Sequence, residues 1–121
     1  MPRFSETLRE HAQYPSNQGP IVGADLVGKA SLNCNPPYIT LYLKVSDDVI
    51  TRAGFESAGC GVTTAICSVT TELIEGTSLE DCKLITVDQV CQRLDGVPPD
   101  KRHCVLVVLK ALNNALGVAD Q

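Results

Sequence analysis

The sequence contains no tryptophan, and aromatic residues make up only 4% of its 121 residues. A core of this composition must be aliphatic, and the few aromatic side chains offer no stacking platform for the bases of a single strand. Basic residues are also few, since 10 Lys and Arg stand against 14 Asp and Glu, for a net charge of −4. Nucleic-acid binding needs a basic surface. We therefore expect no nucleic-acid partner.

Long apolar runs are missing as well. No segment approaches the ~20 apolar residues that a transmembrane helix needs, so we expect no membrane partner. The first residues, Met1–Glu6, have no apolar signal core, which makes the cytoplasm the expected compartment. A chain of 121 residues is long enough for one hydrophobic core, and we predict a single domain over residues 1–121.

Cysteine, by contrast, is plentiful: the chain has six, together with two histidines. In a secreted protein they would suggest three disulfides, whereas in a cytoplasmic one they indicate buried thiols, metal ligands or catalytic groups. The sequence has no Ser-His-acid order, no glycine-rich phosphate loop and no paired catalytic carboxylates. We therefore expect a binding or carrier protein, not an enzyme.

Alternating apolar residues predict three strands joined by short loops, which is typical of an antiparallel meander. The strands are expected at residues 22–32, 38–45 and 49–55. Two asparagines and two prolines at 33–37 are expected to interrupt the sheet. In the third strand, Val49, Thr51, Ala53 and Phe55 are predicted to face the core.

Helical periodicity predicts the remaining elements. We expect helices at residues 3–13, from just after Gly61 to a stop at Gly76, from a capping box at Thr86 to about Leu94, and from about Asp100 to Leu116. The last of these is apolar nearly all round and is predicted to be buried.

Two cysteines stand at predicted helix starts. Cys60 lies between two glycines at a strand-to-helix junction, and Cys104 follows His103 just after a Pro-Pro loop. The free N–H groups of a helix start stabilise negative charge and lower the pKa of a thiol. If the two helix N-termini point to the same place, they form a site for zinc or an iron–sulfur cluster. Its soft or borderline ligands would be Cys60, His103 and Cys104.

The other cysteines are less ligand-like, because a lone cysteine is more often a buried hydrophobe than a ligand. Cys34, in a polar loop, is a candidate fourth ligand or an ordinary loop residue. Cys67 lies ~10 Å along the helix from Cys60, which favours a core position. Cys82 and Cys91 are predicted to be buried thiols, and His11 a solvated surface residue.

Three segments of the chain occur in a characteristic order. They are Tyr14–Gly19, Ala53–Gly61 running on into the helix with Thr70–Leu79, and Gly96–Cys104. The first is similar to Asn-Pro-x-Asn-x-Gly and the last to Leu-Pro-Pro-x-Lys-x-His-Cys. In this order and spacing, from about Phe4 to Leu116, the chain resembles the NifU/IscU-type iron–sulfur cluster assembly scaffold, the NifU N-terminal domain family.

The resemblance implies an α+β fold of the SufE/NifU-like kind, with a three-stranded antiparallel sheet and helices packed on it. It implies that sulfur from a cysteine desulfurase and iron are built into a [2Fe–2S] cluster, which passes to apo iron–sulfur acceptor proteins. The family's ligands carry over to Cys60 and Cys104, and His103 and Lys101 match the family's histidine and lysine beside the site. Zinc can occupy such a site in isolated protein.

The chain departs from the family at the first ligand motif. Aligned without gaps, the family's Cys-Gly-Asp falls on Asn35–Pro37, so that Cys34 stands one residue early and the aspartate is missing. We expect Cys34 to complete a site with Cys60, His103 and Cys104. A zinc-binding protein, or a sulfur-acceptor or adaptor relative that completes no cluster, is the alternative.

The resemblance bears on partners too. Some relatives use a dedicated chaperone ATPase, and Asp100 here replaces their valine beside the Pro-Pro pair. A monomer or a homodimer is expected.

Overall fold

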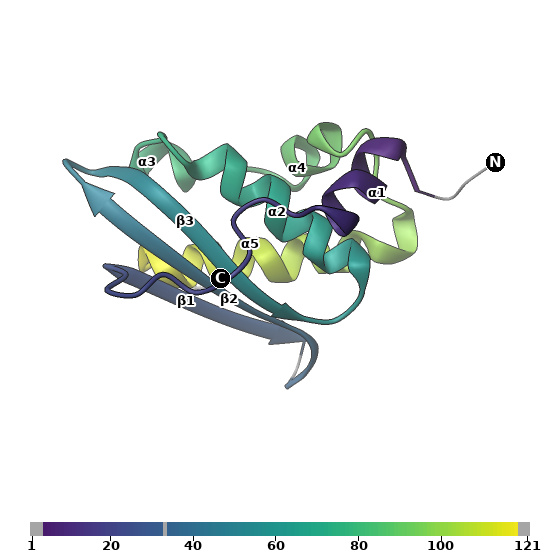
Figure 1. Ribbon diagram of the computed structural model, residues 1–121, viewed down its shortest axis with the longest axis horizontal. Helices are drawn as coiled ribbons and strands as arrows, with labels where there is room; N and C mark the ends of the chain where they lie inside the picture. Colours follow the sequence, from purple (N-terminus) through teal and green to yellow (C-terminus); the bar gives the residue numbers. More distant parts are fainter. Residues whose placement is uncertain (1–3, 33, 119–121) are drawn as a thin grey trace.

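The computed structural model describes residues 4–32 and 34–118. Its strands form one antiparallel sheet in the order β1-β2-β3, and its helices lie against one face of that sheet (Figure 1). The elements are α1 (Glu6–Gln13), β1 (Leu26–Leu32), β2 (Asn35–Ser46), β3 (Val49–Ala58), α2 (Gly61–Ile74), α3 (Leu79–Cys82), α4 (Val87–Arg93), the 3-10 helix η1 (Pro99–Lys101) and α5 (Arg102–Leu116). The predicted α+β fold is confirmed.

The middle strand, β2, has the alternation that its sequence predicts. Ile39, Leu41 and Leu43 are fully buried, and the residues between them face the other side of the sheet. The predicted interruption at 33–37 is wrong in part, because β2 already begins at Asn35. The prolines are tolerated since the pairing with β3 reaches only Tyr38, so they remove no hydrogen bond from the three-stranded region. Residue 33 lies outside the described residues.

The third strand does not alternate throughout. The register between β2 and β3 shifts at a β-bulge, and Thr51 is left without a pairing partner. As a result Ile50 is buried and Thr51 exposed, so the prediction that Thr51 faces the core is wrong, whereas it is confirmed for Ala53 and Phe55.

The first strand is shorter than predicted. It begins at Leu26, and Val22 is 97% exposed in the turn before it. Before that turn, the segment around Asn17 pairs with the free edge of β3, where the N–H of Gly19 donates to the carbonyl of Phe55. This segment covers an edge that would otherwise be open to pairing with another chain.

The helix α2 is the centre of the helical layer. It packs on β3 and α5 on one side and on α1 and α4 on the other, and its predicted apolar stripe is buried. Polar side chains such as Thr63 and Ser68 are buried with it. Because α2 is held on all sides, its first residue, Gly61, has a fixed position relative to the sheet.

The C-terminal half also follows the sequence closely. The capping box at Thr86 is present, and α4 ends at Arg93. The short helix α3 was not expected from the sequence. The last helix packs on β1 and β2 and is capped by Gly117, but Leu106 is 59% exposed, so the helix is not buried all round. Within the described part of the chain, no helix has the length and apolar character required to cross a membrane.

Candidate functional site

Cys60 is the N-cap residue of α2, directly after the end of β3. Its backbone is extended, and its side chain is exposed. The preceding residue, Gly59, is tightly packed: a Cβ there would lie 3.1 Å from the Cβ of Pro37 and 3.2 Å from Oγ1 of Thr63. Glycine at this position therefore lets the β3–α2 junction approach β2 closely, and it fixes where the Cys60 thiol stands.

The surroundings of Cys60 favour its thiolate. Partial burial raises the pKa of this thiol, but the N–H and hydroxyl of Thr63, the N–H of Val62 and the charge of Lys101 lower it, and the net pKa lies below the ordinary value. The Sγ of Cys60 lies 3.8 Å from Oγ1 of Thr63. No full capping hydrogen bond forms to the Cys60 side chain, so the backbone N–H groups act through their charge.

Cys104 lies in the first turn of α5 and is only 3% exposed. Burial raises the pKa of its thiol, the Thr63 hydroxyl and the Lys101 charge lower it, and the charge and hydrogen bond of Cys60 raise it further. Cys60 and Cys104 are therefore neighbours, brought together by two helix starts. Nε2 of His103 lies 3.5 Å from Sγ of Cys104, while His103 itself is exposed.

Thr63 is the residue of this site that sequence reasoning missed. It is 1% exposed, and its hydroxyl interacts with the thiols of both Cys60 and Cys104. The signal was present in the spacing, because a residue three positions after an N-cap lies directly above it. Its hydroxyl lies between two thiols, that of Cys60, whose pKa is lowered, and that of Cys104, whose pKa is raised.

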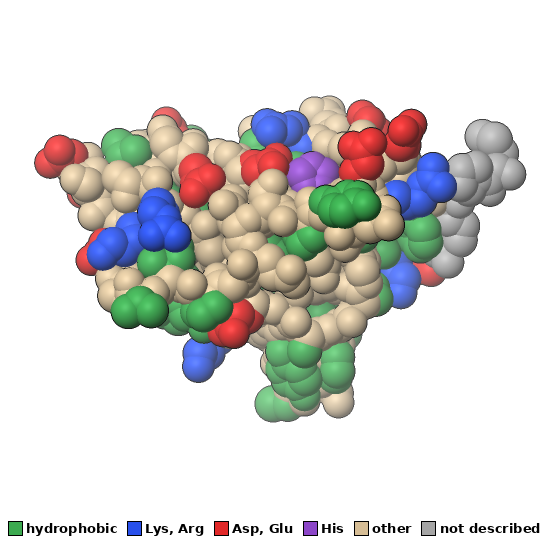
Figure 2. Space-filling model, viewed as in Figure 1, with side chains coloured by type: hydrophobic (Ala, Val, Ile, Leu, Met, Phe, Trp, Pro, Cys, Tyr) green, Lys and Arg blue, Asp and Glu red, His purple; other side chains and the backbone are tan. Residues whose placement is uncertain are grey.

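Cys34 stands apart from this pair. It is exposed, it has a positive φ of 65°, and its carbonyl accepts a 2.7 Å hydrogen bond from the Tyr38 hydroxyl. It lies on the β1–β2 hairpin, where Leu32 and Tyr38 are also exposed. Apolar side chains gather at the bottom of the face that Figure 2 shows, at the end of this hairpin. Within the described residues no polar contact joins Cys34 to Cys60 or Cys104.

The hairpin is nevertheless on the same end of the molecule as the thiol pair. Pro37, just after its tip, is the residue that Gly59 contacts, next to Cys60. Among residues 4–32 and 34–118, no three His, Cys, Asp or Glu side chains stand as a group able to hold a metal ion. The structure thus assembles two thiols and a histidine neighbour, with a third thiol on a nearby hairpin.

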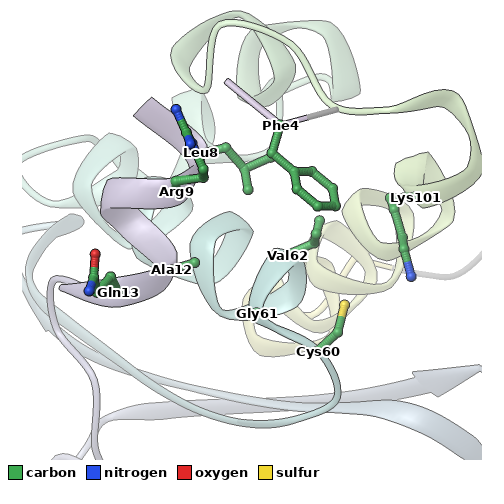
Figure 3. A pocket seen from close by; sticks show the side chains of 9 residues that line it. All are labelled: Phe4, Leu8, Arg9, Ala12, Gln13, Cys60, Gly61, Val62 and Lys101. Carbon is green, nitrogen blue, oxygen red and sulfur yellow. The ribbon is translucent and has the colours of Figure 1, made fainter. Parts of the chain in front are cut away.

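A pocket of about 390 Å³ opens beside Cys60, between α1 and the start of α2 (Figure 3). Its apolar lining comes from Phe4, Leu8 and Ala12 before or on α1 and from Val62 on α2. The Cys60 sulfur and the Lys101 amine lie at one end of it.

The remaining predicted residues can also be placed. Cys67, Cys82 and Cys91 are buried, as predicted. Burial raises the pKa of the Cys67 thiol, and the nearby Cys104 thiol raises it further. Burial, with a smaller effect of Asp81, raises the pKa of Cys82 to about 11.

The prediction that His11 is a solvated surface histidine is wrong. Its side chain is 18% exposed, its Nδ1 lies 2.7 Å from Oγ of Ser68, and its Nε2 lies 3.9 Å from a carboxylate oxygen of Glu72. It joins α1 to α2.

Comparison with known proteins places the whole chain in one group. The family model described as NifU-like N terminal domain matches residues 3–119. An "Iron-sulfur cluster assembly scaffold protein IscU 1" of Archaeoglobus fulgidus is 34% identical over 113 residues, covering 93% of this chain and 74% of that protein. A scaffold protein IscU of Rickettsia prowazekii is 34% identical over 121 residues, covering 94% of this chain and 89% of that protein.

Solved structures have the same fold. A proposed iron–sulfur cluster assembly scaffold protein of the SUF system from Fervidobacterium islandicum superimposes with a TM-score of 0.74 at 23% identity, covering 94% of this chain and 96% of that one. The N-terminal part of a NifU-like protein from Brucella abortus gives a TM-score of 0.62 at 18% identity, covering 93% and 82% of the two chains. At these identities the likeness supports the fold alone.

Proposed function

Because the chain belongs to the family of NifU-like N-terminal domains, we propose that it is an iron–sulfur cluster assembly scaffold. The cluster is its product and cargo. Its role as a scaffold is that of the relatives that match most of its length.

The observation that carries the proposal is the adjacent pair Cys60 and Cys104 at two helix starts. One thiol is exposed and favoured as thiolate, and the other is buried and favoured as thiol. A thiolate is the form that attacks a persulfide sulfur and binds a metal ion. Cys60 therefore receives sulfur first, and Cys104 supplies a second sulfur ligand beside it.

We assign His103 and Cys34 to the remaining ligand positions. His103 lies against Cys104 on an exposed turn, so its ring can reach solvent-borne iron. Cys34 reaches the pair by a shift of the β1–β2 hairpin. With three cysteines and one histidine, the site suits a [2Fe–2S] cluster, and zinc in its absence.

The partners that this role requires are a cysteine desulfurase as sulfur source and apo iron–sulfur proteins as acceptors. A ligand set that is partly exposed and not yet brought together fits such a role, since a cluster that must leave is held by few fixed ligands. A sulfur acceptor that completes no cluster would use the same Cys60 thiolate, and reconstitution separates the two roles.

The test is anaerobic reconstitution with iron, sulfide and thiol, followed by visible absorption. We expect charge-transfer bands in wild type, their loss in Cys60→Ala, and a shorter cluster lifetime in Cys34→Ala. Cys91→Ala is the matched control, because Cys91 is a buried cysteine outside the site. Absence of the bands in wild type, or bands unchanged in Cys60→Ala, would falsify the proposal.

A further inference from the structure

We propose that the pocket between α1 and the start of α2 binds an apolar side chain of the peptide segment that delivers persulfide sulfur to Cys60. This inference rests on the proposed function, and it adds a binding site for the sulfur donor. The occupant is a partner's peptide loop in which an apolar residue stands next to the persulfidated cysteine.

The shape of the pocket fits such a segment. Its volume of about 390 Å³ has room for a large side chain and the adjoining backbone. Leu8 and Val62 form a buried apolar floor, and Phe4 and Ala12 complete the wall. Figure 3 shows Cys60 at the edge of this apolar surface, so a side chain in the pocket would bring the next residue of its chain to the thiol.

The charge around the pocket also selects its ligand. The charged side chains that line it are Arg9 and Lys101, and among the described residues no Asp or Glu does so. The chain as a whole has a net charge of −4, so this is a local exception. Lys101 has no ion-pair partner within residues 4–32 and 34–118. A persulfide is readily ionised, and transfer of its outer sulfur leaves a thiolate on the donor. A cation beside Cys60 that has no ion-pair partner would stabilise either negative charge.

The transfer itself is balanced without an oxidant or reductant. The Cys60 thiolate attacks the terminal sulfur of the donor's R–S–SH, the donor's S–S bond breaks, and a new S–S bond forms on Cys60. The electron pair of the broken bond leaves with the donor as R–S⁻, and the proton stays on the transferred sulfur. Lys101 stabilises the negative charge as it moves from Cys60 to the departing thiolate.

The experiment compares two short peptide persulfides that differ in one residue next to the persulfidated cysteine, leucine in one and serine in the other. Mass spectrometry follows the rate at which Cys60 gains one sulfur atom. In wild type we expect the leucine peptide to react about tenfold faster, because its side chain leaves water for the apolar floor.

A filled pocket should abolish that preference. Ala12 lies in the wall beside Gly61, and Ala12→Phe places a ring in the space, with Ala12→Ser as the control of nearly native size. We expect Ala12→Phe to react with both peptides at the slow rate, while Ala12→Ser keeps the preference. Ala12→Met is a smaller filler that serves if Ala12→Phe does not fold, as judged by its thermal transition. Lys101→Gln should slow both peptides equally.

Equal rates for the two peptides on wild type would overturn the inference, as would a preference that survives in a folded Ala12→Phe or Ala12→Met. Glutathione persulfide reacting as fast as the leucine peptide would overturn it too, because the apolar floor would then contribute nothing. Cluster formation from iron and sulfide bypasses the donor. Its failure in wild type with the peptide preference intact would therefore refute the scaffold role alone.

Discussion

Replacement of Gly28 by alanine should destabilise the fold severely, because α5 lies directly on this residue of β1. A Cβ at Gly28 would lie 2.1 Å from the carbonyl oxygen of Ala111, 2.5 Å from the amide nitrogen of Ala115 and 2.7 Å from its Cβ. The two nearest atoms are backbone, so no side-chain rotation can relieve the clash. The whole helix must move away from the sheet.

The size of the effect follows from that displacement. Overpacking a core by one carbon costs about 1–3 kcal/mol when side chains can adjust. Here α5 must shift by roughly 1 Å, and a gap of that size forfeits about a quarter to a half of each van der Waals contact along its buried face. We therefore expect Gly28→Ala to lower the free energy of unfolding by about 3 kcal/mol or more, which for a chain of this length lowers Tm by about 10 °C.

Urea denaturation and a thermal scan measure both quantities. Gly61→Ala is the matched control, since the nearest atom to an added Cβ there is the Cβ of Ala12 at 3.6 Å, an ordinary contact. Gly61 is the first residue of α2, and alanine there should leave the free energy of unfolding unchanged or raise it by up to about 1 kcal/mol. If Gly28→Ala unfolds within about 0.5 kcal/mol of wild type, the close packing of α5 on β1 is refuted.

Three further predictions concern the site and its supporting helices. Thr63→Val keeps the shape of a buried residue but removes the hydroxyl, so the pKa of the Cys60 thiol should rise. Alkylation of Cys60 at pH 7 should then slow about fivefold, the equivalent of ~1 kcal/mol, and Thr63→Ser should restore the rate. Iodoacetamide should modify Cys60 well before Cys104 at neutral pH, because the pKa of the Cys60 thiol is lowered, whereas the Cys104 thiol has a raised pKa and is 3% exposed. Peptide mapping that finds the reverse order would contradict Cys60 as the more reactive thiol. Thr86→Ala should cost about 1 kcal/mol in urea denaturation through loss of the capping box, and an unchanged midpoint would show that the cap contributes nothing.

The features that the sequence predicted well are those encoded over short distances. Alternation in β2, the capping box at Thr86 and the helix starts at Gly61 and Arg102 depend on neighbouring residues, and all were found within a few positions. The helix-start argument also pointed to Cys60 and Cys104, and the structure places their thiols side by side.

What the sequence could not supply depends on residues far apart along the chain. The bulge at Thr51 results from the pairing of β3 with β2. Val49 and Ile50 are both apolar and would face opposite sides of a regular strand, so the local sequence does not show which of them faces the core. His11 is held by Ser68, 57 positions away, and no pattern around His11 signals that contact.

The two thiols of the proposed site differ in their exposure to solvent. Cys60 is exposed, whereas Cys104 is only 3% exposed, so we expect a metal ion to reach Cys60 first in the proposed site. The far end of α5 cannot yield, because it is locked against Gly28. Its start is held by a one-turn 3-10 helix and by the 2.9 Å pair of Arg102 with Asp88, and an exposed pair of this kind contributes little. The N-terminal turn, which carries His103 and Cys104, is held mainly by the burial of Cys104 and Val105, which are 3% and 0% exposed. For the proposed site we therefore expect loading to begin at Cys60 and to be completed at Cys104.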